Sequence, residues 1–271
     1  IALLTLVTAG GAVVLMMPLA WMISTSLKPL GQVWIFPPKW IPERPLWRNY
    51  LEVFTARPYL LYIRNTILLV AVGELGTLLS CSVVAYGFAR TRFPGRDVLF
   101  MILLGTMMIP GYVTLIPMFI LFKQIGWLDT YKPLLVPAFF GSPVYIFLLR
   151  QFYMTVPLEM DDAAKIDGCG YFAIYWRILL PLIKPALAAV AIFTFMGRWN
   201  DWFGPLIYLM DERKWPVALG LLSYQYMEST YYIKWNTLMA ASVLTLIPCL
   251  LLFFLAQRIF IQGVVITGIE K

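Results

Sequence analysis

The stretch DDAAKIDGCGYFAIYWRILLP, residues 161–181, is a polar, helix-forming segment inside a chain that is otherwise built of apolar runs. Its two leading aspartates follow Glu159, and carboxylates in a first turn offset the positive end of a helix dipole. The pair Asp167-Gly168 predicts the end of this helix, because glycine adopts the left-handed backbone that helix ends require. A second helix, YFAIYWRILL, follows at once. The sequence therefore predicts a helix–turn–helix elbow over residues 155–180, lying along a membrane face.

The composition outside the elbow sets the class of the protein. Hydrophobic residues make up 61% of the chain and charged residues 13%, whereas soluble domains have about half and about a quarter. The chain is therefore expected to be an all-α integral membrane protein. Because each spanning helix needs roughly 20 apolar residues, 271 residues leave room for about six and for no large soluble domain.

Hydropathy predicts six spans in a single transmembrane domain, residues 1–271, at about 1–27, 62–90, 98–122, 133–150, 181–210 and 235–260. The first run is too long for a signal peptide and has no small-residue cleavage site, which favours a spanning helix. Basic residues flank the spans on both sides, so their number does not orient the chain. The three arginines of RTRFPGR favour a cytoplasmic position for that short loop.

The residue inventory argues against an enzyme. Histidine, the commonest acid–base catalyst and metal ligand, is absent, and no nucleophile–base or metal constellation is recognisable. The three cysteines are scattered without a CxxC spacing and predict neither a disulfide framework nor a metal site. The net charge of +7 comes from residues beside apolar spans, where they meet lipid headgroups. No nucleic-acid partner is expected.

Two interpretations of the elbow follow from its residues. An amphipathic helix at a membrane face can rest on lipid headgroups, or it can fit into a groove of a partner protein. Headgroup-bound helices favour Lys and Arg on their polar face, whereas this helix carries four acids against Lys165 alone. The charge pattern favours a protein partner.

The segment DAAKIDGCGYFAIYWRILLPLIKP, Asp162–Pro185, resembles the EAA loop of the membrane subunits of ATP-binding-cassette (ABC) importers. That loop has the pattern E-A-A, two residues, D-G, a spaced aromatic residue and L-P. The matching positions are Asp162, Ala163 and Ala164 with Asp in place of Glu, Asp167 and Gly168, Tyr175 where Phe is usual, and Leu180 and Pro181. The resemblance covers nearly the whole chain in eight blocks, and it is sharpest for the smaller permease of maltose-type carbohydrate importers.

The resemblance implies a type I ABC importer permease fold in which the elbow is a cytoplasmic coupling helix. The implied partners are a second permease in a heterodimer, two copies of an ATPase subunit and an extracytoplasmic sugar-binding protein. The residues expected to contact the ATPase are Asp162, Ala163, Ala164, Asp167 and Gly168. The chain has no G-x-x-x-x-G-K-[ST] phosphate loop, so ATP and Mg²⁺ would bind to the partner ATPase.

The implied function is import of a sugar or related carbohydrate across a bacterial or archaeal plasma membrane, driven by ATP hydrolysis in the partner. Disaccharides, oligosaccharides and polyol phosphates all remain open as substrates. The C-terminal QGVVITGIEK is expected on the ATPase side, within reach of the ATPase dimer.

Several polar residues in the spans are candidates for the substrate pathway. Glu74 is a carboxylate near the middle of a span, where such a group is costly and usually faces the bundle interior or water. A protonated, hydrogen-bonded packing residue is the alternative. Pro110 and Pro117 predict kinks in the third span, which would allow the hydroxyls of Tyr112 and Thr114 to meet a sugar. Hydrogen-bonded helix contacts are the competing interpretation of both hydroxyls.

The motif RWNDW, at residues 198–202, combines aromatic faces with polar groups. Its tryptophans are expected to be interfacial anchors, and Asn200 and Asp201 are the pathway candidates. A different class of protein, an ion-coupled secondary carrier, would use Glu74 as its coupling site. Such carriers usually have paired internal repeats, and no such repeat is visible in this chain.

Overall fold

The computed structural model describes residues 2–226 and 233–266. Within those ranges every regular element is a helix, as an all-α membrane protein requires. The C-terminal QGVVITGIEK, predicted to contact an ATPase, spans residues 262–271, of which 262–266 are helical and 267–271 lie outside the described residues.

The described helices fit the expected number of spans. Four are long and apolar enough to cross a membrane: Leu4–Ser26, Tyr59–Arg90, Lys132–Thr155 and Trp235–Gln257. Two further candidates are bent pairs, Arg96–Thr106 with Gly111–Gln124 at 95° and Tyr171–Leu182 with Lys184–Trp199 at 76°. Counting each pair as one span gives six, the number predicted from hydropathy.

The third span, predicted over 98–122 with kinks at Pro110 and Pro117, is broken into two helices. Helix α4 (Arg96–Thr106) ends before Pro110, whose extended backbone (ψ 131°) precedes α5 (Gly111–Gln124). A proline has no N–H to donate and disfavours a helical residue before it, so the chain turns here. Helix α5 continues through Pro117 without a break.

The fifth span also differs from the predicted 181–210. Its helical path begins at Tyr171, bends at Ile183 and ends at Trp199. Pro185 cannot donate to a carbonyl in the preceding turn, which accounts for the bend. The residues predicted as the end of this span form a separate short helix, α12 (Phe203–Tyr208).

The chain divides into two compact units. The first takes its described residues from 1–65 and 215–251, with elements α1 (Ala2–Ser26), η1 (Leu30–Gln32), α2 (Arg48–Ala56), the start of α3 (Tyr59–Arg90), α13 (Val217–Ser223), η5 (Tyr224–Tyr226) and the start of α14 (Trp235–Ile266). The buried Asn49 amide donates to the carbonyls of Ser26 (2.8 Å) and Lys28 (2.9 Å). It thereby satisfies backbone oxygens that the end of α1 leaves free.

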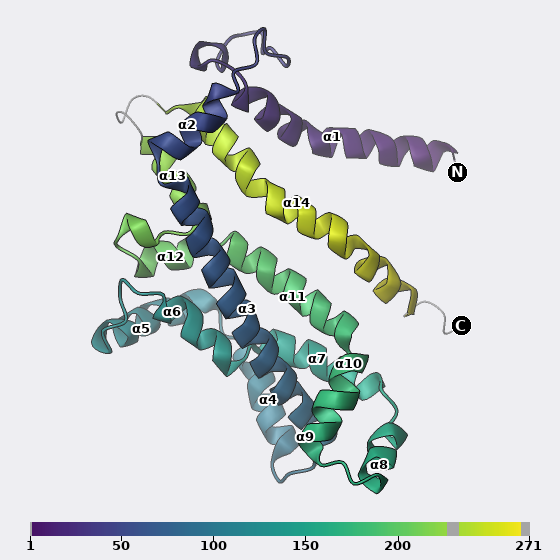
Figure 1. The fold of residues 1–271 in the computed structure, drawn as a ribbon. Helices are drawn as coiled ribbons and strands as arrows, with labels where there is room; N and C mark the ends of the chain where they lie inside the picture. Colours follow the sequence, from purple (N-terminus) through teal and green to yellow (C-terminus); the bar gives the residue numbers. More distant parts are fainter. Residues whose placement is uncertain (1, 227–232, 267–271) are drawn as a thin grey trace. The chain divides into compact units, whose positions relative to one another are not determined.

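The second unit takes its described residues from 66–214 and from the end of α14. Its elements are the rest of α3, α4, α5, α6 (Lys132–Leu135), η2 (Val136–Phe140), α7 (Pro143–Thr155), α8 (Glu159–Ile166), α9 (Tyr171–Ala173), η3 (Ile174–Leu179), α10 (Leu180–Leu182), α11 (Lys184–Trp199), α12 and η4 (Glu212–Lys214). Figure 1 shows α8 at the end of this unit opposite α12. A core of buried side chains, including Ala85, Leu149, Leu179 and Val190, joins α3, α7, η3 and α11.

Candidate functional site

The elbow ends its first helix as the sequence predicts. Helix α8 covers Glu159–Ile166, and Gly168 follows with a left-handed φ of +82°. The N–H of Gly168 donates to the Lys165 carbonyl (3.0 Å), and the N–H of Cys169 donates to the Ala164 carbonyl (2.9 Å). This pair of bonds is a Schellman motif, which requires a left-handed residue at the position of Gly168.

Helix α8 has an inner and an outer face. On the inner face, Ala164 is only 5% exposed and belongs to the core of the second unit. On the outer face, Asp162 and Ala163 are exposed, and Ile166 is 88% exposed. Asp162 accepts a hydrogen bond from Lys165 (2.9 Å), which raises the pKa of the lysine ammonium group. Four of the five predicted ATPase-contact residues are therefore exposed, whereas Ala164 points inward.

A buried arginine fixes the inner face of α8 to the transmembrane helices. Arg90, the last residue of α3, donates from Nη2 to the carbonyls of Tyr153 and Val156 at the end of α7. Its Nη1 lies 3.7 Å from Oδ1 of Asp161 in α8. Neither residue was predicted to be part of the site. Two features of the sequence could have indicated them: Asp161 directly precedes the EAA-like triplet, and Arg90 is the last residue of a predicted span.

The second arm of the elbow is also bonded to α3. The hydroxyl of Tyr86 donates to the carbonyl of Tyr171 (3.0 Å), and the hydroxyls of Ser82 and Tyr175 are 2.8 Å apart. Tyr175 is 3% exposed. One helix, α3, thus holds both arms through buried polar contacts.

Within the described part of the chain, four of the predicted pathway residues contact a nearby ring or backbone groups. Tyr112 is 81% exposed, and its ring lies edge-on to that of Phe203 with 6.4 Å between centroids. Two others satisfy backbone groups nearby: Thr114 donates to the Gly111 carbonyl, and Asn200 donates to the Met196 carbonyl. Asp201 accepts from the N–H of Gly204 (3.0 Å). Thr114, Asn200 and Asp201 therefore bond backbone groups within four residues of their own positions.

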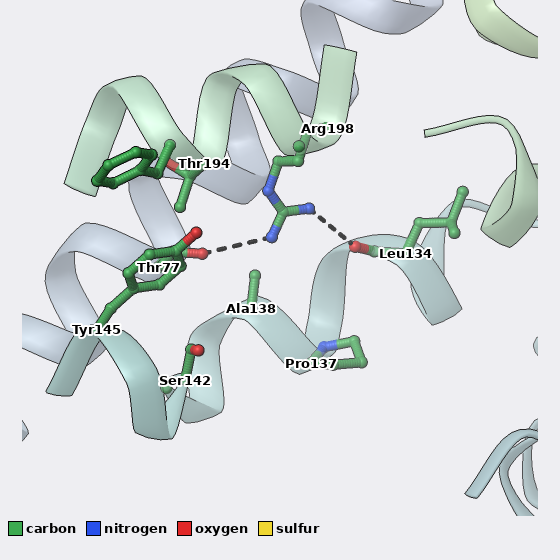
Figure 2. A pocket seen from close by; sticks show the side chains of 11 residues that line it. Thr77, Leu134, Pro137, Ala138, Ser142, Tyr145, Thr194 and Arg198 are labelled. Carbon is green, nitrogen blue, oxygen red and sulfur yellow. Dashed lines mark hydrogen bonds between the residues drawn. The ribbon is translucent and has the colours of Figure 1, made fainter. Parts of the chain in front are cut away.

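A different set of residues lines a cavity of about 340 Å³ in the second unit. Figure 2 shows the Arg198 guanidinium directed at it, with hydrogen bonds to the Thr77 hydroxyl and the Leu134 carbonyl, both 3.3 Å. Ser142, Tyr145 and Thr194 contribute further polar groups to the lining. Of the predicted candidates, Asn200 follows Arg198 by two residues, and Glu74 precedes Thr77 by three residues on α3. Arg198 could have been predicted as a functional residue, because it is a charged residue within the predicted apolar span 181–210.

The chain is similar to a known protein family and to several individual proteins. Residues 78–266 match the family model described as "Binding-protein-dependent transport system inner membrane component". The arabinooligosaccharides transport system permease protein AraQ of Halalkalibacterium halodurans is 32% identical, over 99% of this chain and 96% of that protein. The sn-glycerol-3-phosphate transport system permease protein UgpE of Yersinia enterocolitica is 33% identical, over 86% and 85%. The diacetylchitobiose uptake system permease protein NgcG of Streptomyces coelicolor is 30% identical, over 91% and 82%.

A solved structure shares the fold. It is a chain of a bacterial ABC transporter involved in the import of the acidic polysaccharide alginate, with a TM-score of 0.85 and 22% identity over 95% of both chains. The predicted all-α importer-permease fold is confirmed.

Proposed function

Since the chain belongs to the family of binding-protein-dependent transport system inner membrane components, it is a non-catalytic, multi-pass permease subunit of an ABC importer, and we propose that its cargo is a carbohydrate or a related polyol. The named relatives that support this proposal carry arabino-oligosaccharides, diacetylchitobiose and sn-glycerol 3-phosphate. These cargoes share several hydroxyl groups and differ in charge. An ion-coupled carrier has no support among these relatives.

Permeases of this family work with another permease, with ATPase subunits and with a binding protein. We propose that this chain forms a single transmembrane domain, residues 1–271, and pairs with a different permease in a heterodimer. The heterodimer would bind two copies of an ATPase subunit. These copies bind ATP and Mg²⁺, and an extracytoplasmic protein delivers the sugar.

The observation that carries the coupling proposal is that α8 has one buried face and one exposed face. Its outer face offers Asp162, Ala163, Asp167 and Gly168 to a groove of an ATPase subunit, and the exposed Ile166 adds apolar surface to the same contact. Its inner face, through Asp161, is fixed to α3 and α7. A displacement of α8 by the ATPase would therefore be transmitted to two spanning helices.

Uptake into proteoliposomes tests the proposed function. The chain, reconstituted with its partner subunits and binding protein, is expected to accumulate labelled arabino-oligosaccharide or sn-glycerol 3-phosphate only when ATP is supplied on the ATPase side. Uptake that needs no ATP and follows a proton or sodium gradient would support the carrier and contradict the proposal.

A further inference from the structure

The cavity is lined by the positively charged guanidinium of Arg198, which lies beside the middle of a spanning helix. Arg198 lies in the last turn of α11, but its guanidinium packs against α3 at Gly73, near the middle of the 32-residue helix. A Cβ added to Gly73 would lie 2.4 Å from Cζ of Arg198. The absence of a side chain at Gly73 therefore makes the space that the guanidinium occupies.

The guanidinium is incompletely neutralised. Its hydrogen bonds go to two neutral oxygens, those of Thr77 and Leu134. Among the residues that the structure describes, no carboxylate oxygen lies within 4 Å of it, and Glu74 and Asp201 act on it only at longer range. A cation at this depth is costly unless an anion pairs with it, and a guanidinium offers a planar fork of donors that matches a carboxylate or a phosphate.

The remaining lining suits a polyhydroxyl molecule. The hydroxyls of Ser142 and Tyr145 line the cavity, and neither makes a side-chain hydrogen bond within the described ranges of the chain. Thr77 already donates to the Gly73 carbonyl (2.9 Å) and accepts from Arg198, so its orientation is fixed. A volume of about 340 Å³ is within the range of small-molecule sites.

We propose that this cavity binds the acidic group of an anionic sugar or polyol, with Arg198 pairing a carboxylate or phosphate and with Ser142 and Tyr145 bonding the neighbouring hydroxyls. This proposal rests on the proposed function and deepens it, since it names a charge class for the cargo. Glu74 is then a competing negative charge beside the site, and its removal should preserve or strengthen anion binding.

Equilibrium binding to the purified complex of this chain with its partner permease and ATPase subunits tests the proposal. The probes are D-glucuronate, sn-glycerol 3-phosphate and the neutral D-glucose, so the two acidic probes distinguish a carboxylate from a phosphate. The wild-type complex should bind at least one acidic probe about tenfold more tightly than glucose, the order expected for a charged hydrogen-bonded pair. Arg198→Gln should abolish that preference, Arg198→Lys should keep part of it because an ammonium lacks the planar fork, and glucose binding should not change.

Two matched variants separate local from general effects of charge. Arg213→Gln removes a cation from an exposed site on the same unit, with a side chain 84% exposed, and should leave every affinity unchanged. Glu74→Gln should not weaken binding of the acidic probes. An effect of Glu74→Gln as large as that of Arg198→Gln would make the two residues a structural pair and overturn the proposal.

The preference of the wild-type complex for acidic probes over glucose can be measured even if a variant fails to fold. Equal affinity for acidic and neutral probes, or unchanged acidic binding in Arg198→Gln, would also overturn the proposal. If ATP-driven uptake of a neutral sugar is observed at the same time, the proposed function stands and only the anion site fails.

Discussion

Arg90 and Asp161 form an ion pair between the end of α3 and the first turn of α8, with 3.7 Å between Nη1 and Oδ1 and side chains only 2% and 6% exposed. Arg90 also donates to the carbonyls that end α7. A single guanidinium thus joins the proposed coupling helix to two spanning segments. The contact is buried, so its charges cannot be solvated separately when one partner is removed.

Asp161→Asn should therefore destabilise the protein strongly. Leaving Arg90 charged and buried without its partner should cost about 3–5 kcal/mol of unfolding free energy. Thermal unfolding of the detergent-solubilised chain without its ATPase subunits measures the loss. The matched control is Asp162→Asn in the exposed Asp162–Lys165 pair, where side chains 69% and 51% exposed predict a change below about 1 kcal/mol. Equal effects of the two variants would show that the buried pair has no special role.

Tyr175→Phe should cause a smaller loss. The substitution restores the residue usual in the EAA pattern and removes the 2.8 Å bond between the Tyr175 and Ser82 hydroxyls. Ser82 keeps its bond to the Leu79 carbonyl, so we expect a cost of about 1 kcal/mol. A double-mutant cycle with Ser82→Ala checks the assignment. Additive effects of the two substitutions would mean that the hydroxyls do not interact.

Asp129 should make stability depend on pH in the acid range. The hydrogen bond from Lys214 is the main cause that lowers the pKa of the Asp129 carboxyl. Because the folded-state pKa lies below the unfolded one, this stabilisation is present above the usual aspartate pKa of about 3.9 and is lost as the pH falls through the folded value. Asp129→Asn should lower the unfolding temperature at pH 7, and the difference from wild type should shrink below about pH 4.

Asparagine is the appropriate replacement because Asp129 has a φ of +55°, which asparagine tolerates. A difference from wild type that stays constant between pH 7 and pH 3 would assign the effect to the backbone rather than to the charge.

Gly220→Ala should overpack the first unit. An added Cβ would lie 2.4 Å from Cδ2 of Tyr62, which is fully buried, and overpacking typically costs 1–3 kcal/mol. Gly87→Ala is the control with the opposite sign, because its Cβ meets no atom within 4 Å and alanine favours a helix by about 0.5–1 kcal/mol. The ranking of unfolding temperatures should be Gly87→Ala, wild type, Gly220→Ala. A reversed order would contradict the packing described around Tyr62.

The sequence predicted those features that depend on local pattern. Apolar runs gave the number of spans, and the Asp167-Gly168 pair gave the end of α8. The lengths of the third and fifth spans were not predictable in the same way, because hydropathy stays high through Pro110 and past Trp199 while backbone hydrogen bonding stops. Proline predicted kinks at both Pro110 and Pro117, but only Pro110 lies at a break, and α5 continues through Pro117.

Contacts between distant segments were the part that the sequence could not provide. Arg90 and Asp161 are 71 positions apart, and Thr77 and Arg198 are 121 apart. Pathway candidates were chosen as polar residues in apolar context, but Thr114 and Asn200 turned out to bond their own helices. A side chain's neighbours depend on helix packing, which a single sequence does not specify.

The central claim, that the elbow couples ATP hydrolysis to transport, is tested most directly by two proline variants placed two residues apart. Gly168 has a φ of +82° and donates to Lys165, so Gly168→Pro is incompatible with the turn. Gly170 has a φ of −76°, which proline adopts, and a Cβ there meets no atom within 4 Å. Substrate-stimulated ATPase activity of the reconstituted, fully assembled complex should disappear in Gly168→Pro and persist in Gly170→Pro. Stimulation that survives in both variants would contradict the claim.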